Sequence, residues 1–207
     1  PFSYKKPLEG DNELSLRLPI SYTEVESAGS FLVMPSISYK TPVLADNSWF
    51  VTPSLGYGVV GSIDLGSVGQ IVSAALTSDL LLFQQENFSL SMGNMVGYYK
   101  SLPLNLKDYN LDPDLSNTMM RNGLLLSVPL QQKLAGRHLT AETYVINTRA
   151  FGSPLYEEYY NEIGITIGPE KVSRSNANLS QQAFGIGLSY SWASHSHGFS
   201  FSLGYEF

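Results

Sequence analysis

The chain contains no cysteine among its 207 residues, which excludes disulfides, thiolate nucleophiles and cysteine-ligated metals together. Charged residues are also scarce, at 14% against the roughly 25% of an average globular domain. Only 12 residues are lysine or arginine, against 18 acidic residues, and they form no basic cluster that could neutralise phosphates. We therefore expect no nucleic-acid partner.

Long hydrophobic runs are missing as well. The longest, such as Leu80 to Phe83, fall far short of the roughly 20 residues that a membrane-spanning helix needs. No N-terminal signal pattern is present, and the chain starts at "PFSYKKPLEG" without methionine. We expect a mature form, an expressed fragment or the end of a longer protein.

The sequence does contain a repeated alternation of apolar and small polar residues, which is typical of β-strands. At the C-terminus one face of a strand would carry Phe199, Phe201, Leu203, Tyr205 and Phe207, and the other Ser200, Ser202, Gly204 and Glu206. The pattern predicts about ten strands, in residues 14–22, 31–40, 49–59, 72–82, 88–98, 124–130, 139–148, 163–167, 184–192 and 199–207. In residues 139–148 the two faces remain ambiguous.

The polarity of the faces indicates the surroundings of these strands. A soluble sheet would carry charged residues on its polar face, whereas glycine, serine and threonine dominate here. Strands of roughly 9–12 residues are long enough to cross a bilayer at a tilt, and they must then pair with one another throughout. Several apolar faces end in an aromatic residue, as in an interfacial girdle; these residues are Tyr22, Tyr39, Trp49, Tyr98, Trp192 and Phe207.

The predicted fold is therefore all-β: a closed antiparallel up-and-down transmembrane β-barrel of about ten strands. Eight or twelve strands, and a soluble β-sandwich or jelly roll, remain as alternatives. Residues 1–11 are expected to form an N-terminal extension or periplasmic segment, and residues 12–207 the barrel. An even number of strands would place both termini on one side.

Connections and prolines test this interpretation. The tight turn at Gln84 to Asn87 suits the periplasmic side, and the long linker of roughly Ser101 to Asn122 then falls on the extracellular side. The long segment "GPEKVSRSNANLSQQ" falls on the side of the short turns, against expectation. Prolines inside the predicted strands favour bulges or shorter paired zones; these are Pro19, Pro35, Pro53 and Pro129.

The closing segment "FSFSLGYEF" resembles the terminal strand of bacterial outer-membrane β-barrel proteins. Such proteins typically end in an aromatic residue that follows alternating apolar positions. The resemblance implies that Phe199, Phe201, Leu203, Tyr205 and Phe207 form a signal read by the barrel-assembly machinery. It also implies that this strand closes the barrel against the first strand. It points to no particular subfamily.

Three motifs have residue types that are found in chemical sites. "GYGVVG" at Gly56 to Gly61 matches a dinucleotide fingerprint in form, but it lies inside an alternating strand and favours curvature or packing. "SHSH" at Ser194 to His197 would lie at the outer rim, where His195 or His197 could serve a hydrolase; a polar turn is the simpler interpretation, as it is for the lone His138. "LKDYNLDPDLSN" lacks the spacing of a calcium loop.

Six charged residues are expected to point into the lumen, where they would pair across it or form a constriction that selects solutes; they are Arg17, Lys40, Asp79, Glu158, Glu162 and Glu206. Several apolar residues share that face, so the lumen is expected to be partly filled or to tolerate an amphipathic passenger; they are Leu32, Met34, Val60, Ile71, Phe83 and Met95.

These observations predict a porin-like conduit in the outer membrane of a Gram-negative bacterium, either a narrow channel or the translocation domain of a longer protein. The alternatives are a structural anchor or adhesin that works through its loops, and a hydrolase at the rim. We expect no enzymatic activity, catalytic residue, cofactor or metal. The expected partners are outer-membrane lipid, lipopolysaccharide, the barrel-assembly machinery, and either an attached passenger or small solutes.

Overall fold

The computed structural model describes residues 2–25, 28–62, 67–106, 109–111, 114–134, 136–169 and 185–203. These residues are mostly β-strands, with one short 3-10 helix, η1, at Glu9–Asp11. The prediction of an all-β, antiparallel, up-and-down sheet is confirmed. No helix in these ranges is long and apolar enough to cross a membrane.

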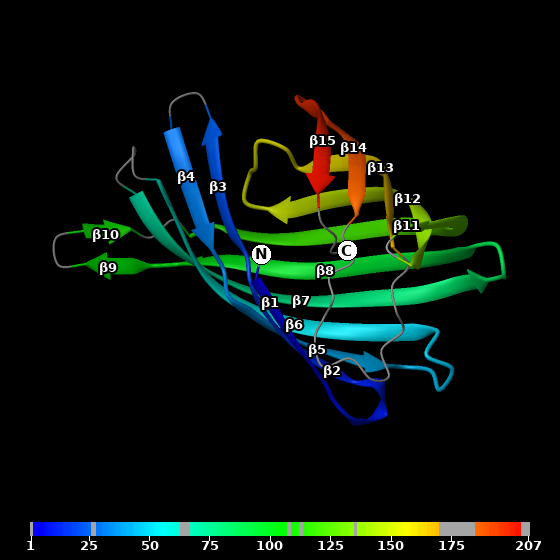
Figure 1. Ribbon diagram of the computed structural model, residues 1–207. Helices are drawn as coiled ribbons and strands as arrows, with labels where there is room; N and C mark the ends of the chain where they lie inside the picture. Colours follow the sequence, from blue (N-terminus) through cyan, green and yellow to red (C-terminus); the bar gives the residue numbers. More distant parts are fainter. Residues whose placement is uncertain are drawn as a thin grey trace. The chain divides into compact units, whose positions relative to one another are not determined.

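Thirteen strands form one sheet, labelled in Figure 1. They are β1 (Phe2–Pro7), β2 (Glu13–Leu18), β3 (Ile20–Val25), β4 (Ala28–Val33), β5 (Ser36–Pro42), β6 (Trp49–Ser62), β7 (Ser67–Gln84), β8 (Ser89–Leu102), β11 (Ser116–Leu134), β12 (Arg137–Gly152), β13 (Tyr159–Pro169), β14 (Ile186–Ala193) and β15 (His197–Leu203). The order across the sheet is β1-β2-β5-β6-β7-β8-β11-β12-β13-β14-β15, and β4 pairs with both β3 and β6.

Prolines account for two of the breaks between strands. Pro19 separates β2 from β3, and Pro35 lies between β4 and β5. Proline has no N–H to donate, so it interrupts a ladder of hydrogen bonds. The register nevertheless continues across both breaks, because the Met34 N–H donates to the Pro19 carbonyl at 3.2 Å and the Tyr57 N–H to the Pro35 carbonyl at 3.1 Å. Joining β2 with β3 and β4 with β5 leaves eleven continuous segments.

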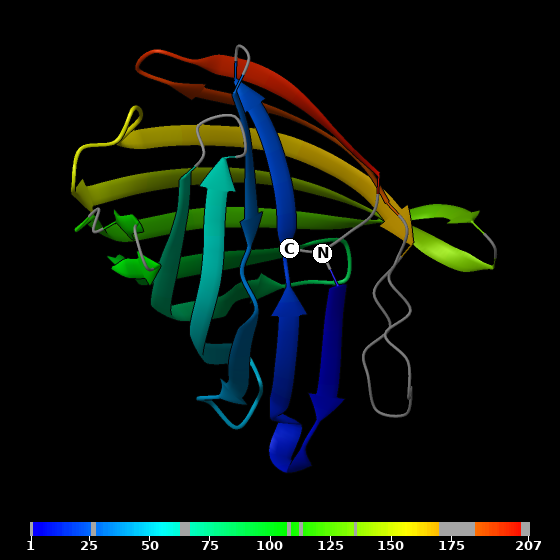
Figure 2. The same ribbon diagram turned by 90° about the vertical axis from the view of Figure 1, so that its left-hand side faces the viewer.

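The predicted number of about ten strands is therefore wrong, and the additional strand is β1. Residues Phe2–Pro7 pair antiparallel with β2 along their whole length, from Phe2 opposite Leu18 to Pro7 opposite Glu13; the two dark-blue strands lie side by side in Figure 2. With eleven antiparallel segments, β1 and β15 run in the same direction. No pairing of β1 with β15 occurs within the described ranges, so closure of the sheet stays a prediction.

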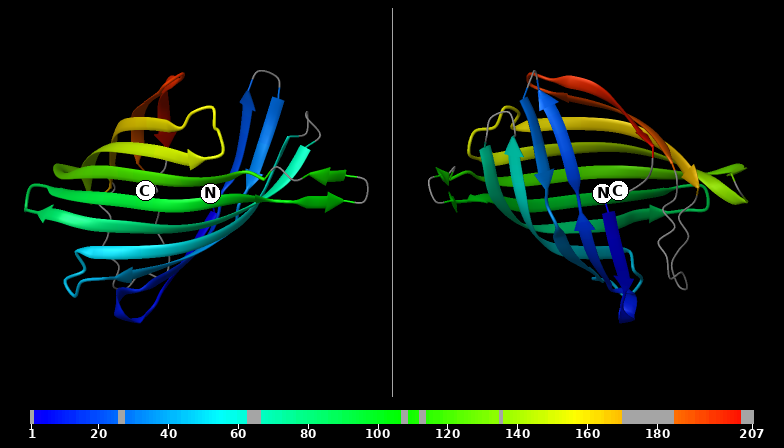
Figure 3. Two further views of the ribbon diagram at one scale, coloured as in Figure 1. Left: turned by 180° about the vertical axis from the view of Figure 1, so that it is seen from behind. Right: turned by 60° about the vertical axis from the view of Figure 1, so that its left-hand side comes forward.

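The chain divides into two compact units. The first consists of Pro1–Ser78, Met95–Met120 and Ala150–Leu155, and the second of Asp79–Asn94, Arg121–Arg149 and Tyr156–Phe207. In the first unit, the segment predicted as the longest linker contains a separate hairpin of β9 (Leu104–Leu106) and β10 (Tyr109–Leu111). Figure 3 shows this green hairpin continuing from the ends of β8 and β11.

The second unit has the opposite polarity from a soluble sheet. Ile163, Ile165 and Ile167 of β13 are 44–47% exposed, whereas Thr166 between them is 4% exposed. Register extends the exposed side through Leu188 to Phe201, and we call this side the apolar face. The opposite side is the polar face; in this unit it includes Glu142, Tyr144, Glu162, Gly164, Thr166 and Ser189. This arrangement of buried polar groups beside exposed aliphatic ones is the reverse of that in a soluble sheet.

Candidate functional site on the polar face

Strand register assembles the polar face of the second unit. In β12 and β13, Tyr144 lies opposite Gly164 and Glu142 lies opposite Thr166. Gly164 in turn lies opposite Ser189 of β14. Since side chains alternate along each strand, these groups all project from the same side. Three adjacent strands thus bring hydroxyl and carboxyl groups together.

Tyr144 and Gly164 form the centre of this arrangement. A Cβ atom at position 164 would overlap the Tyr144 ring, because it would lie 2.7 Å from the Cε1 atom of Tyr144. Only glycine leaves space for the ring there. The Tyr144 hydroxyl donates a hydrogen bond of 2.7 Å to Oε1 of Glu162. The glycine therefore positions the tyrosine, and the tyrosine fixes the orientation of a predicted lumen carboxylate.

A second carboxylate lies on the same strand as Tyr144. Glu142 is 7% exposed, and the Ser127 hydroxyl donates to its Oε1 at 3.4 Å. Arg121 of β11 is close enough to interact electrostatically with Tyr144. This part of the polar face thus combines two carboxylates with one guanidinium, flanked by small residues. It can bind polar or charged groups that approach the sheet from that side.

In the first unit, Lys40 and Arg17 lie on the polar face of β2 and β5, the side opposite Leu16 and Ile37. The Lys40 ammonium lies over the Phe50 ring, 4.3 Å from its centroid, which is a cation–π arrangement. Arg17 is an exposed residue of β2 and lies opposite Ser36 of β5. Beside them Met34 packs over Gly56 and Gly58, where a Cβ atom would lie 2.9 Å from its side chain. Here the polar face is partly covered by an apolar side chain.

The other predicted lumen charges are more scattered. Asp79 is an exposed residue of β7. Glu158 is exposed in the connection before β13 and belongs to no strand, and Glu206 lies outside the described residues. No ion pair joins any two of the five charges that the structure describes. The lumen role of all six stays a prediction.

The terminal-strand signal is described in part. Phe199 and Phe201 lie in β15 and are 77% and 65% exposed on the apolar face. Leu203 ends β15 and pairs with Ile186. Tyr205 and Phe207 lie outside the described residues, so their role in assembly remains an expectation from the resemblance.

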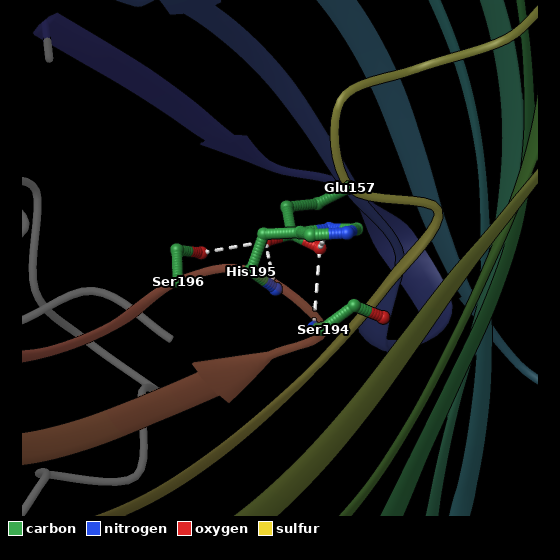
Figure 4. A network of polar contacts seen from close by, with 4 residues as sticks. All are labelled: Glu157, Ser194, His195 and Ser196. Carbon is green, nitrogen blue, oxygen red and sulfur yellow. Dashed lines mark hydrogen bonds and ion pairs between the residues drawn. The ribbon is translucent and has the colours of Figure 1, made fainter.

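Sequence reasoning missed a polar cluster at the turn between β14 and β15 (Figure 4). Glu157, from the connection before β13, accepts hydrogen bonds from the N–H groups of Ser194 at 3.2 Å and His195 at 2.9 Å. It also accepts one from the Ser196 hydroxyl at 2.9 Å, and His195 Nδ1 lies 3.6 Å from its Oε2. The Tyr156 ring lies 5.7 Å from the His195 ring. We call these residues the rim clasp, because one carboxylate holds two connections together.

The rim clasp does not have the geometry of a nucleophile and its base. The Ser196 hydroxyl donates to Glu157 rather than to the imidazole. Within the described ranges, the His195 ring has no hydrogen bond to a serine or threonine hydroxyl. His197 lies 6.5 Å from the Tyr190 ring and His138 is exposed at the start of β12. Among the described residues no three His, Asp or Glu side chains gather as metal ligands.

The rim clasp should loosen in acid. Partial burial would raise the pKa of Glu157, but the hydrogen bonds from His195 and Ser196 and the attraction of His195 outweigh it, so this pKa lies below its ordinary value of 4.5. A lowered pKa in the folded state contributes stability above pH 4.5 that is lost as the pH falls through the folded value.

We therefore expect the hydrogen-exchange protection factors of the Ser194 and His195 amides to fall below pH 4.5. The Glu157→Gln variant should show lower protection at neutral pH and no further loss in acid. Equal protection of the two amides in both proteins at every pH would contradict the clasp.

The comparisons with known proteins bear on the fold. No protein-family model matches the chain, and no curated protein matches it. The crystal structure of the β domain of the Bordetella autotransporter BrkA is similar, with a TM-score of 0.59 and 12% sequence identity, and the match covers 98% of this chain and 84% of that one. The chain therefore shares the fold of an autotransporter β domain.

Proposed function

We propose that this chain is an outer-membrane β-barrel that serves as the translocation domain of a longer protein. The observation that carries the proposal is the inverted polarity of a sheet whose fold is similar, over 98% of the chain, to an autotransporter β domain. In the proposed state the apolar face contacts lipid and the polar face surrounds a narrow passage.

Closure of the sheet belongs to this proposal. A strand edge in hydrocarbon would leave backbone N–H and C=O groups without partners, at several kcal/mol each. Among the described residues, no further strand pairs with the outer edge of β1 or of β15. In a bacterial outer membrane the backbone N–H and C=O groups of these edges need hydrogen-bond partners. We therefore propose that the sheet closes into a barrel there.

The polar face suits a passing polypeptide better than a free flow of solute. In the second unit, Glu142, Glu162 and Arg121 offer charged and hydrogen-bonding groups. In the first unit, Met34 offers an apolar contact. Barrels of this size have little free lumen once side chains fill it. An extended segment could exchange hydrogen bonds with such a surface as it moves. The proposed role requires no chemical reaction, so we propose a non-enzymatic protein.

An export experiment tests the proposal. A signal peptide and a small epitope-tagged reporter are fused ahead of Pro1, and the fusion is expressed in Gram-negative cells. We expect protease added to intact cells to cleave the reporter, while a periplasmic marker protein stays intact. A reporter that remains protected in cells whose barrel has reached the outer membrane would contradict translocation.

A loop-based anchor or adhesin is the second candidate, and the β9–β10 hairpin favours it. This hairpin is a paired element of its own within the connection from β8 to β11. The same cells distinguish the two functions. A protected reporter together with an epitope accessible in the hairpin would favour the anchor.

A further inference from the structure

The apolar face of the first unit is hollowed across β1, β2, β5 and β6. A groove of about 740 Å³ runs over these strands and has an almost entirely apolar lining. Its walls include Phe2, Tyr4, Leu16, Ile37, Leu55 and Tyr57. The volume lies within the range of about 300–1,000 Å³ that is typical of small-molecule sites.

Strand register explains why the walls are continuous. Tyr4 lies opposite Leu16, Leu16 opposite Ile37, and Ile37 opposite Leu55. Four side chains from four strands therefore form one row across the sheet. Residues that alternate with them, such as Ser3 and Gly56, also line the groove.

The large apolar side chains that line the groove are highly exposed. Phe2 is 74% exposed, Tyr4 63% and Leu55 62%, and they belong to one contiguous groove rather than to scattered positions. A groove of this kind marks a binding surface for an apolar ligand. In the proposed membrane-inserted state that ligand comes from the bilayer.

Arg17 is the one charged residue in the lining of the groove, and a second cation, Lys6, lies just beyond that lining. Lys6 follows Tyr4 on the same face of β1 and lies opposite Leu14, which lies opposite Tyr39 of β5. Lys6 is exposed, and it forms no ion pair with any residue that the structure describes. Lysine at such a position extends its ammonium group to the membrane surface while its stem covers apolar atoms. The ligand should therefore have an apolar tail and an anionic head.

We propose that this groove binds a phospholipid, with an acyl chain against Tyr4, Leu16 and Leu55 and the phosphate at Lys6. Phe2 and Lys6 are separated by about 13 Å along the strand, at about 3.3 Å per residue. Half of the hydrocarbon core measures about 15 Å, so the dimensions fit one leaflet. The inference rests on the proposed placement in the outer membrane.

Two observations favour a phospholipid over other occupants. Lys6 lies at the strand ends that lead into the short turns at η1 and at 43–48, the side expected to be periplasmic, where phospholipid rather than lipopolysaccharide is found. A second copy of the chain fits less well, because the strand side chains described on the apolar face include no Asp or Glu that could pair with Lys6.

The test measures lipid retained by the protein after extraction from membranes into mild detergent, by native mass spectrometry. We expect the native protein to retain phospholipid and Lys6→Gln to retain about fivefold less, since one cation near a lipid phosphate contributes about 1 kcal/mol. Leu16→Trp, which fills the groove but leaves Lys6 in place, should also lower retention. Lys100→Gln, on the apolar face of β8 outside the groove, should leave it unchanged.

The outcomes separate this inference from the proposed function. A native chain that fails to insert into the outer membrane would contradict the proposed function. An inserted protein without bound phospholipid, or with equal retention in all three variants, would overturn the groove proposal alone. Bound lipopolysaccharide or a dimer in place of phospholipid would overturn it too.

Discussion

Replacing Leu126 by arginine is expected to destabilise the protein in a membrane by about 2–4 kcal/mol, whereas the same change at Leu134 should cost about 1 kcal/mol or less. Both leucines are exposed residues of β11. Leu126 lies near the middle of the strand and Leu134 at its end. The difference arises because arginine at the bilayer midplane loses its hydration, while arginine at the interface keeps it.

The pair is measured by urea unfolding in lipid vesicles, with migration on unheated detergent gels as the readout. Both variants carry the same charge and the same change in size, so the comparison isolates the position along the strand. Two results would show that this face contacts water and that the membrane interpretation is wrong. Either both variants unfold at the same urea midpoint as the native protein, or Leu126→Arg only makes the protein more soluble in water.

Gly164→Ala is expected to destabilise the protein by about 1–3 kcal/mol, although it adds one methyl group. The new Cβ would overlap the Tyr144 ring, which must then move and weaken its hydrogen bond of 2.7 Å to Glu162. In the Tyr144→Ala background the ring is absent, so the additional effect of Gly164→Ala should nearly vanish. Such non-additivity is expected of residues in direct contact.

Gly198→Ala is the matched control, since a Cβ there would meet no atom within 4 Å. The measurement is the unfolding midpoint of four variants. They are Gly164→Ala, Gly198→Ala, Tyr144→Ala, and the double variant that combines Tyr144→Ala with Gly164→Ala. The proposed contact would be refuted by a Gly164→Ala midpoint equal to that of Gly198→Ala, or by additive effects in the double variant.

Much of the fold could be predicted from alternation alone. The ten predicted strands correspond to the segments from β2–β3 to β15, and the register continues across the breaks at Pro19 and Pro35. Proline removes one hydrogen-bond donor but keeps an extended conformation, so neighbouring rungs stay aligned. β1 was missed because Lys5 and Lys6 follow each other and interrupt the alternation that begins at Phe2 and Tyr4.

The contacts on the polar face could not be predicted in the same way. Whether Tyr144 lies over Gly164 depends on the register between β12 and β13, which neither strand specifies alone, and the faces of residues 139–148 were ambiguous. A glycine flanked by isoleucines in β13 was the available signal for a large side chain opposite. The rim clasp depends on turn conformations, which bring Glu157 and His195 together from positions far apart in the chain.

The most direct test of the central claim, a closed membrane-spanning β-barrel, is the migration of the native protein on a detergent gel with and without boiling. A closed barrel keeps its backbone hydrogen bonds in detergent until it is heated, so it remains compact. The proposed structure predicts two positions, with the unboiled band migrating faster than the boiled one. A single position under both conditions, for protein extracted from the outer membrane, would contradict it.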